Sequence, residues 1–391
     1  MNILFLVPWY PTRHNPAFGI FFRHQAQILA RHHQVCVVHI MVNHPWHLPF
    51  RPLPEITWEQ DGPVIVARCA RTNFLPRLPG GYERVYADTL VQIERMVSLR
   101  IGKLDLIHAN VLWPTGFAAT RLGRPVVIVE HTGPLDVLFA TKAGARATYE
   151  SAQKADVLLA VGEKLREEMR AAGLGPEIDL LPPVVNTDEL VPAPATPSSS
   201  IRLLFVGSLD LPLKRAADLV EALALLTSRG ARRYELTLAG GGDRTAVVAL
   251  ALKRGVGDLC QFLGLIPHDK VLDAIRHCDI FVHPSEAETF GVAPAEALAC
   301  GRPAVVARSG GPDTFVDSSV GAVVEPRSPE ALAAAISEVA DRLPTFDPQR
   351  LHQHISTKFG PEKFLEAAEN YYKIAIWRHE RRHHKPTNPR H

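Results

Sequence analysis

The sequence predicts an α/β protein of two Rossmann-like domains, each a parallel sheet with helices on both faces. Short apolar runs of strand length alternate with helical patterns along the 391-residue chain. A proline- and serine-rich segment, 190–200, interrupts this alternation and is the expected linker. The alternation then restarts at Leu203. A chain of this length has room for two to three domains.

The expected N-terminal domain is 1–189. Its strand candidates are the apolar runs 3–7, 35–40, 64–68, 106–108, 126–129, 157–161 and 178–181. Helical patterns cover 22–31, 82–100 and 163–172, and Gly173 provides a stop for the last one. The first run lacks a preceding basic region and is broken by Pro8, so we interpret it as a strand and not a signal peptide.

The expected C-terminal domain is 201–357. Strands are predicted at 203–206, 236–239, 261–263, 279–282 and 305–307, and helices at 216–228, 244–254, 269–277 and 329–343. A further helix, 358–377, precedes a basic tail, 378–391, that we expect to be disordered. The tail is either a solvated terminus or a lipid-binding segment.

Composition excludes several classes of function. A net charge of +2 gives no bulk electrostatic case for nucleic-acid binding. The five cysteines have no CxxC spacing, which indicates a reducing cytoplasm and no metal site. No apolar run approaches the length needed to span a membrane.

The stretch 279–311 carries the main functional signal. A helix expected to begin near Val292 leaves the backbone N–H groups of Phe290, Gly291, Val292 and Ala293 without intrahelical partners. Such a helix start suits a phosphate, and glycine allows close approach to the backbone.

Glu288 precedes the helix and Glu296 lies on its first turn. Carboxylates accept hydrogen bonds from hydroxyl groups, so a diphosphate flanked by polyols, as in a nucleotide-sugar, fits the pattern. The alternative is that Glu296 only complements the helix dipole and Glu288 is a solvated loop residue.

The context of these glutamates resembles the donor-site motif of retaining family-4 (group 1) glycosyltransferases. Pro284-Ser285 comes before, Phe290-Gly291 between, and Ala299-Cys300-Gly301 with Pro303 after. The resemblance covers most of the chain, best over 203–326, and implies the GT-B fold. In that fold two Rossmann-like domains face a central cleft, and the C-terminal helix, here 358–377, crosses back to the N-terminal domain.

The resemblance implies roles for residues of the second domain. Lys214 matches a lysine that neutralises the donor diphosphate. Ser208 stands where the family usually has arginine, a departure that removes a charge, and the neighbouring Arg215 is the candidate to compensate. Gly241 belongs to a glycine turn that either lines the nucleotide or is purely structural. Glu288 would bind sugar hydroxyls.

Further roles are implied for Glu296 and for the first domain. Glu296 would bind ribose hydroxyls. His131, after an apolar strand, matches the family's active-site histidine, which contacts the transferring sugar or aligns the acceptor. Gly19, in the first strand-to-helix loop, resembles the version in polysaccharide-building members and would approach a phosphate, with Arg23 adding charge nearby. His108 is interpreted as support for its loop.

The implied activity is transfer of a hexose-type sugar with retention of configuration, with His131, Lys214 and Glu288 as catalytic residues. The resemblance implies no cofactor and no metal: the co-substrate is a nucleotide diphosphate-sugar, with UDP- and GDP-sugars as the leading candidates. The expected acceptor is a glycan or lipid-linked saccharide in cell-surface polysaccharide or glycolipid biosynthesis.

The sequence leaves alternatives for the activity and for the surface loops of the first domain. A sugar-nucleotide epimerase or hydrolase on the same fold is one alternative, and a non-catalytic nucleotide-sugar-binding partner, favoured by Ser208, is another. The loops 46–53 and 74–82 mix apolar and basic residues, so they either rest on an anionic membrane surface or are packed surface loops. We expect a cytoplasmic protein, peripheral on the inner face of the membrane.

Overall fold

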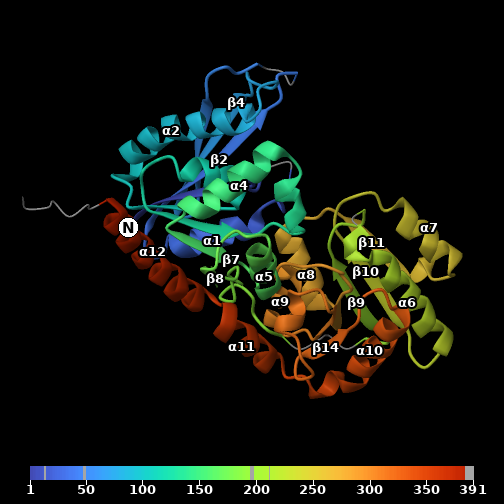
Figure 1. Ribbon diagram of the computed structural model, residues 1–391. Helices are drawn as coiled ribbons and strands as arrows, with labels where there is room; N and C mark the ends of the chain where they lie inside the picture. The colour runs from blue at the N-terminus through green and yellow to red at the C-terminus, as the bar shows by residue number, and fades with distance from the viewer. Residues whose placement is uncertain (13–14, 47–49, 194–197, 211, 384–391) are drawn as a thin grey trace, which may run out of the picture. The chain divides into compact units, whose positions relative to one another are not determined.

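The computed structural model describes residues 1–12, 15–46, 50–193, 198–210 and 212–383 (Figure 1). The described chain divides into two compact α/β units. Unit 1 contains Phe18–Pro182, the strand before it and the chain from Phe364, and unit 2 contains Pro183–Lys363. The change of unit therefore precedes the predicted linker 190–200, of which 194–197 lie outside the described residues.

Unit 1 is built on an eight-stranded sheet in the order β3-β4-β2-β1-β5-β6-β7-β8. All neighbouring pairs are parallel except the antiparallel pair β3–β4. The strands are β1 (Asn2–Val7), β2 (Gln34–Asn43), β3 (Glu55–Asp61), β4 (Val64–Thr72), β5 (Leu106–Asn110), β6 (Val126–Glu130), β7 (Val157–Ala160) and β8 (Ile178–Leu180). The strand order reverses between β1 and β5, where ligands of such sheets bind.

The helices of unit 1 agree with the predicted patterns, with additions. They are α1 (Ile20–Leu29), α2 (Gly81–Ile101), α3 (Phe117–Ala119), α4 (Lys142–Lys154) and α5 (Glu163–Ala171). The sequence patterns missed α4 and strand β3. β3 lies at the sheet edge with alternating exposed and half-buried residues, so it contains no continuous apolar run.

Unit 2 is built on a six-stranded parallel sheet in the order β11-β10-β9-β12-β13-β14. Its strands are β9 (Ile201–Val206), β10 (Tyr234–Ala239), β11 (Cys260–Gly264), β12 (Ile280–His283), β13 (Ala304–Ala307) and β14 (Gly321–Val324). Its helices are α6 (Ala216–Arg229), α7 (Thr245–Lys253), α8 (His268–His277), α9 (Val292–Ala299), α10 (Pro329–Arg342) and α11 (Pro348–Phe359). The strand order reverses between β9 and β12.

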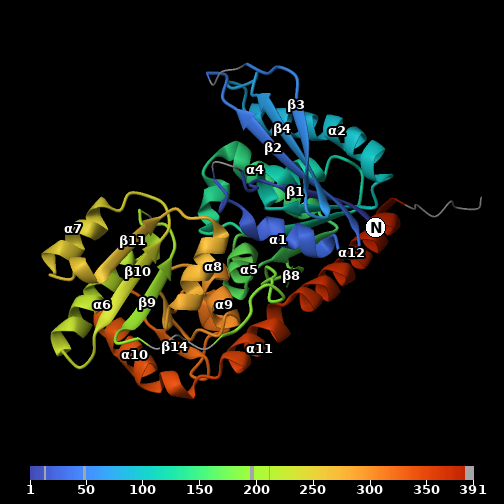
Figure 2. The same ribbon diagram turned by 180° about the vertical axis from the view of Figure 1, so that it is seen from behind.

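Helices cover both faces of the unit 2 sheet, and each face has its own core. Leu219, Leu223 and Ile336 of α6 and α10 pack on one face. Ile275 and Leu298 of α8 and α9 pack on the other. Figures 1 and 2 show this sheet between α6, α7 and α10 on one side and α8 and α9 on the other. The prediction of two parallel-sheet α/β domains is confirmed.

The C-terminal helix α12 (Pro361–His383) is longer than predicted. We expected disorder from residue 378, but the helix continues because its arginines find partners in unit 1. Arg378 pairs with Glu177 at 2.9 Å, and Arg382 pairs with the buried Asp156. The rest of the predicted tail, 384–391, lies outside the described residues. Within the described chain, no helix is both long enough and apolar enough to cross a bilayer.

Candidate functional site

The predicted donor residues of unit 2 follow the carboxyl ends of neighbouring parallel strands. Ser208 and Lys214 lie in the loop after β9, Gly241 follows β10, and Glu288 and Gly291 lie between β12 and α9. Because parallel strands end at one edge of the sheet, these loops meet where the strand order reverses between β9 and β12.

Glu288 is held by two cationic or donor side chains. Lys214 Nζ lies 2.6 Å and His283 Nε2 lies 2.7 Å from Glu288 Oε1. Since a carboxylate only accepts hydrogen bonds, the proton in the second contact belongs to His283 Nε2. Both hydrogen bonds are accepted by Oε1, and no side chain of the described residues donates to Oε2. Oε2 is the atom left to accept a hydroxyl from a ligand.

This environment keeps Glu288 ionised. Burial raises the pKa of its carboxyl, but attraction to His283 and Lys214, with their hydrogen bonds, outweighs burial and holds that pKa well below its usual range. Glu288 is therefore an acceptor and not a proton donor near neutral pH. Lys214 keeps further N–H groups for a second anionic partner.

The start of α9 has the geometry of an anion site. Gly291 precedes it with φ 91°, and the first intrahelical bond runs from Ala295 N to Gly291 O at 3.4 Å. The N–H groups of Val292 and Ala293 therefore lack intrahelical acceptors and lie at the positive end of the helix. The Phe290 side chain is buried against Phe315 and Phe359, so only its backbone is available.

Glu296 is the fifth residue of α9, just beyond the first turn where it was predicted, and it is also held by a histidine. His268 Nε2 of α8 lies 2.8 Å from Glu296 Oε1. Burial lowers the pKa of His268, but the hydrogen bond and charge of Glu296 outweigh burial and raise it. The pair therefore orients a nearly buried carboxylate.

The loops after β9 and β10 are joined by Ser208. Its Oγ donates to Asp210 Oδ1 at 2.5 Å and lies 3.5 Å from Gly241 O. Arg215 does not join this group, because its guanidinium binds Asp218 at 2.8 and 2.9 Å. The structure therefore does not support the prediction that Arg215 replaces the charge missing at Ser208, because Asp218 in the first turn of α6 binds the Arg215 guanidinium.

In unit 1, His131 lies after β6 with its ring fixed by Asn110. His131 Nε2 is 3.1 Å from Asn110 Oδ1, and Asn110 Nδ2 donates to Leu6 O at 3.1 Å. Burial, and repulsion from His108, lowers the pKa of His131 to about 3, so the ring is neutral. Glu130 fixes the loop backbone by accepting N–H bonds from Leu112, His131 and Thr132.

Gly19 begins α1 beside this histidine. It has φ 76°, and a Cβ at this position would lie 2.7 Å from Trp9 O, so the close backbone approach requires glycine. The rings of Phe21 and Phe22, on the first turn of α1, lie 5.6 and 4.9 Å from the His131 ring. Arg23, expected to add charge near this loop, instead binds Asp61 of β3.

Sequence reasoning missed the residues that orient the predicted ones. His283 and His268 hold the glutamates of unit 2, and Asn110 and Glu130 hold His131 and its loop. Polar residues at the carboxyl ends of buried strands, as with His283, Asn110 and Glu130, are the signal that points to them. In the described ranges, no group of three or more His, Cys, Asp or Glu residues could hold a metal ion.

Comparison with known proteins identifies similar chains. Residues 19–183 match the family described as glycosyl transferase 4-like domain, and residues 186–344 match glycosyl transferases group 1. A curated relative, D-inositol 3-phosphate glycosyltransferase 1 of Catenulispora acidiphila, is 31% identical over 294 residues, which cover 70% of this chain and 66% of the relative.

Solved structures share the fold. Sucrose-phosphate synthase of Thermosynechococcus elongatus has a TM-score of 0.73 at 19% identity, covering 95% of this chain and 98% of that one. Anabaena HepE, solved in complex with UDP-glucose, has a TM-score of 0.68 at 19% identity and covers 95% of this chain and 100% of its own. These similarities confirm the predicted GT-B class of fold.

Proposed function

Because the chain belongs to the group 1 glycosyl transferases, we propose that it transfers a hexose-type sugar from a nucleotide diphosphate-sugar with retention of configuration. The acceptor is a glycan or lipid-linked saccharide. The supporting observation is the group Lys214, Glu288 and His283 at the carboxyl edge of the unit 2 sheet, beside the N-terminus of α9.

In this proposal the protein supplies position and charge. The bond from the anomeric carbon to the leaving phosphate oxygen breaks, and the acceptor hydroxyl oxygen bonds that carbon on the same face. The hydroxyl proton passes to the leaving phosphate. Lys214 and the N–H groups of Val292 and Ala293 stabilise the phosphate charge as it develops. No metal is needed to neutralise it.

The two glutamates serve as hydroxyl acceptors in this scheme. Glu288 Oε2 accepts a hydroxyl of the transferring sugar while Oε1 stays bound to Lys214 and His283. A carboxylate tied in this way on a phosphate-binding loop suits ligand orientation better than covalent attack. Glu296, oriented by His268, accepts the ribose hydroxyls.

The neutral His131 is assigned to the reacting sugar or the acceptor. With its Nε2 proton directed at Asn110, Nδ1 is left as an acceptor for a hydroxyl. Gly19 exposes the backbone at the start of α1 to a phosphate. We place the activity in cell-surface polysaccharide or glycolipid synthesis, peripheral on the inner face of the membrane.

The donor is tested by isothermal titration of the full chain with UDP-, GDP- and ADP-sugars. We expect saturable binding of one nucleotide-sugar, and UDP- and GDP-sugars are the candidates. The HepE complex with UDP-glucose supports the first of these. Glu296→Gln should weaken binding about tenfold through loss of a charge-assisted hydrogen bond. Glu286→Gln, in the same loop as Glu288 but paired with Arg327, is the matched control. Failure to bind any of these sugars would overturn the proposal.

The reaction is tested by product analysis after donor identity is known. Glycans, lipid-linked saccharides and inositol 3-phosphate, which the curated relative's name contains, are offered as acceptors. Retention is measured from the anomeric coupling of the product, and activity should survive a chelator. Release of free sugar or an epimer without acceptor would indicate the hydrolase or epimerase alternative, and binding without turnover would indicate a non-catalytic partner.

A further inference from the structure

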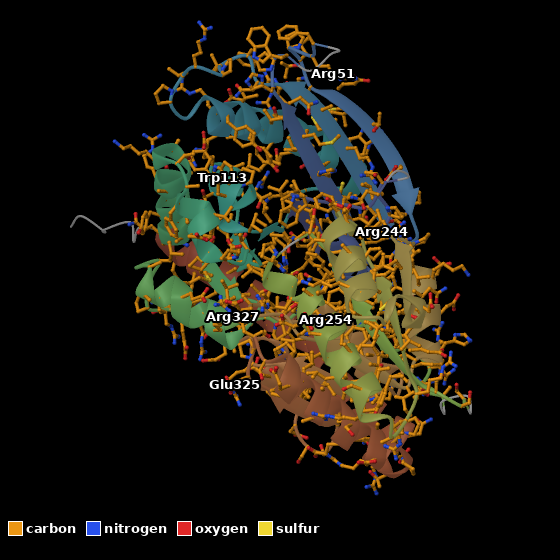
Figure 3. All side chains as sticks on the ribbon, turned by 90° about the vertical axis from the view of Figure 1, so that its right-hand side faces the viewer. Arg51, Trp113, Arg244, Arg254, Glu325 and Arg327 are labelled. Carbon is orange, nitrogen blue, oxygen red and sulfur yellow. The ribbon has the colours of Figure 1, made fainter. Side chains whose placement is uncertain are left out.

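An indole and a carboxylate meet beyond the carboxyl end of β5 in unit 1. Trp113 lies in the loop after β5, and its Nε1 donates at 3.0 Å to Oε1 of Glu83, in the first turn of α2. The ring of Tyr82 lies 5.6 Å from the indole ring, at an angle of 41°. Trp113 is labelled in Figure 3, in the teal part of the chain. We call Trp113, Glu83 and Tyr82 the indole–carboxylate site.

The backbone that leads to Trp113 is held in an unfavourable conformation. Val111 has φ 69° and ψ 148°, a region that is strongly disfavoured for a β-branched residue. Two hydrogen bonds keep it there: Leu112 N donates to Oε2 of the buried Glu130 at 2.7 Å, and Thr115 Oγ1 donates to Val111 O at 2.7 Å. Strained backbone persists where the surrounding structure imposes it, commonly at ligand sites. Here the strained residue directs the chain that carries Trp113 out of the sheet.

The loop that carries Trp113 is bonded to the loop that carries His131. Glu130 accepts the N–H of His131 at Oε1, at 2.8 Å, and the N–H of Leu112 at Oε2. Asn110, the last residue of β5, lies 3.1 Å from the His131 ring. The loops after β5 and β6 therefore form one hydrogen-bonded framework. Trp113 and the histidine assigned to the reacting sugar or the acceptor belong to this same framework.

Glu83 has hydrogen-bonding capacity left for a ligand. Only 5% of the residue is exposed, and the neutral indole N–H is the one donor that the described residues supply to its carboxylate. Its Oε2 has no donor among them and is not sealed from solvent. A nearly buried carboxylate is costly unless several donors surround it. Oε2 therefore favours a ligand that brings hydroxyl groups, which donate without adding charge.

An indole beside a carboxylate suits a sugar ring. Trp113 is half-buried, so part of its ring meets solvent while the Nε1 edge is fixed. The C–H bonds on one face of a pyranose carry partial positive charge and pack on the negative face of an indole. The hydroxyl groups at the rim of the same ring donate to a carboxylate. A phosphate group is opposed here, because its charge has the sign of the Glu83 carboxylate.

We propose that the indole–carboxylate site binds the acceptor through a neutral pyranose ring, which stacks on Trp113 and donates a hydroxyl to Glu83 Oε2. This inference rests on the proposed glycosyltransferase function and narrows its acceptor class. The sugar unit held at this site is an uncharged pyranoside and not a phosphate-bearing polyol such as inositol 3-phosphate. Trp113 and Glu83 are thereby residues that determine acceptor specificity, and Tyr82 supports the indole ring.

The test is saturation-transfer NMR of the full chain, without donor, with the methyl pyranosides of glucose, mannose, galactose and N-acetylglucosamine. We expect at least one of them to bind with its ring C–H protons saturated from the protein. Trp113→Leu should weaken that binding about tenfold through lost stacking and apolar burial. Glu83→Gln should weaken it about tenfold through loss of a charge-assisted hydrogen bond. Trp113→Phe keeps an aromatic face and should retain most of the binding.

Matched controls lie elsewhere in the same unit. Trp58, a half-buried tryptophan of β3, has Arg100 over its ring at 4.0 Å, and Glu94 of α2 pairs with Arg124 at 3.0 Å. Trp58→Leu and Glu94→Gln should bind the pyranosides like wild type. Absence of pyranoside binding by wild type, or binding unchanged in Trp113→Leu, would overturn the proposal. Tighter binding of inositol 3-phosphate that Trp113→Leu weakens would overturn it as well.

Two further measurements keep the outcomes distinct. Thermal melting shows whether each variant folds, and if Trp113→Leu does not, unchanged pyranoside binding by Glu83→Gln overturns the proposal. Donor titration of each variant is measured separately. Donor binding without a pyranoside contact at Trp113 removes this site and leaves the proposed function. Pyranoside contact at Trp113 without binding of any donor keeps the sugar site and removes the proposed function.

Discussion

Each of the two glutamates of the candidate site is held by an imidazole from a neighbouring element. His283 at the end of β12 binds Glu288 at 2.7 Å, and His268 at the start of α8 binds Glu296 at 2.8 Å. A carboxylate fixed in this way loses little side-chain freedom when it binds a hydroxyl, so ligand orientation costs less. These histidines are positioning residues in the proposed mechanism.

The pair His268–Glu296 predicts a pH-dependent contribution to stability. The folded-state pKa of His268 is raised above its ordinary value of 6.5, so the stabilisation is fully present below about pH 6.5 and is lost as pH rises through the raised pKa. His268→Gln should therefore lower the melting temperature more at pH 6 than at pH 8. Thermal unfolding at both pH values measures the difference.

His277→Gln, at the other end of α8, is the control, since its ring binds the backbone oxygen of Asp273 and, among the residues that the structure describes, no carboxylate. An equal loss at both pH values for His268→Gln would show that the ion pair makes no pH-dependent contribution.

At the scale of elements, the glycines in the loops at the carboxyl ends of the unit 2 strands differ in how strictly the backbone requires them. Gly291 has φ 91°, and a Cβ there would lie 2.4 Å from Pro312 Cγ. A Cβ at Gly240 would lie 1.9 Å from Gly207 O, where the loops after β9 and β10 meet. A Cβ at Gly241 would only touch Leu265 at 3.9 Å. The fold requires glycine at the first two positions, whereas at Gly241 it leaves room for a Cβ.

Alanine substitutions at these glycines separate folding from binding. Gly291→Ala should destabilise unit 2 by about 2 kcal/mol or more, because left-handed backbone and Pro312 both oppose a side chain. Gly241→Ala should leave the melting temperature unchanged and weaken donor binding if that turn lines the nucleotide. Calorimetric melting and donor titration measure the two effects.

The outcome for Gly241→Ala decides between the two interpretations of the glycine turn. Unchanged stability with unchanged donor affinity would show that this glycine does not contact the nucleotide. An unchanged melting temperature for Gly291→Ala would contradict the packing argument against Pro312.

At the scale of the whole molecule, the chain returns to unit 1 through α12. Its buried face includes Phe364, Leu365 and Tyr372, and Tyr372 Oη lies 2.7 Å from Nδ1 of the buried His108. His108, expected to support its loop, therefore anchors this helix. Unit 1 is thus completed by residues more than half the chain away in sequence, so it needs the full chain to bury its core.

Loss of this anchor predicts a graded loss of stability. Tyr372→Phe leaves a buried histidine nitrogen without its partner and should cost about 1–3 kcal/mol in the free energy of unfolding, measured by urea denaturation. Truncation after Gly360 removes the whole apolar face and should give aggregation in place of a cooperative transition. A soluble, cooperatively folding truncation would contradict the role assigned to α12.

Local patterns were sufficient to predict most helices and central strands, because apolar periodicity reports burial directly. Strand β3 escaped prediction because its edge position leaves alternate side chains exposed. The end of α12 escaped because its arginines are stabilised by Glu177 and Asp156, which are distant in sequence. Judged from composition alone, the segment from Arg378 is expected to be a disordered basic tail.

In the site as well, local sequence signals predicted some features, whereas others depend on tertiary packing. Local signals in the stretch 279–311 correctly placed the start of α9 at Val292, because a helix start depends on neighbouring residues. Phosphate and hydroxyl recognition there stays a prediction. Pairing of Lys214 with Glu288 depends on how strands β9 and β12 lie in their sheet, and orientation of His131 by Asn110 depends on β5 and β6. Such contacts between distant residues are set by packing, and only the tertiary structure decides them.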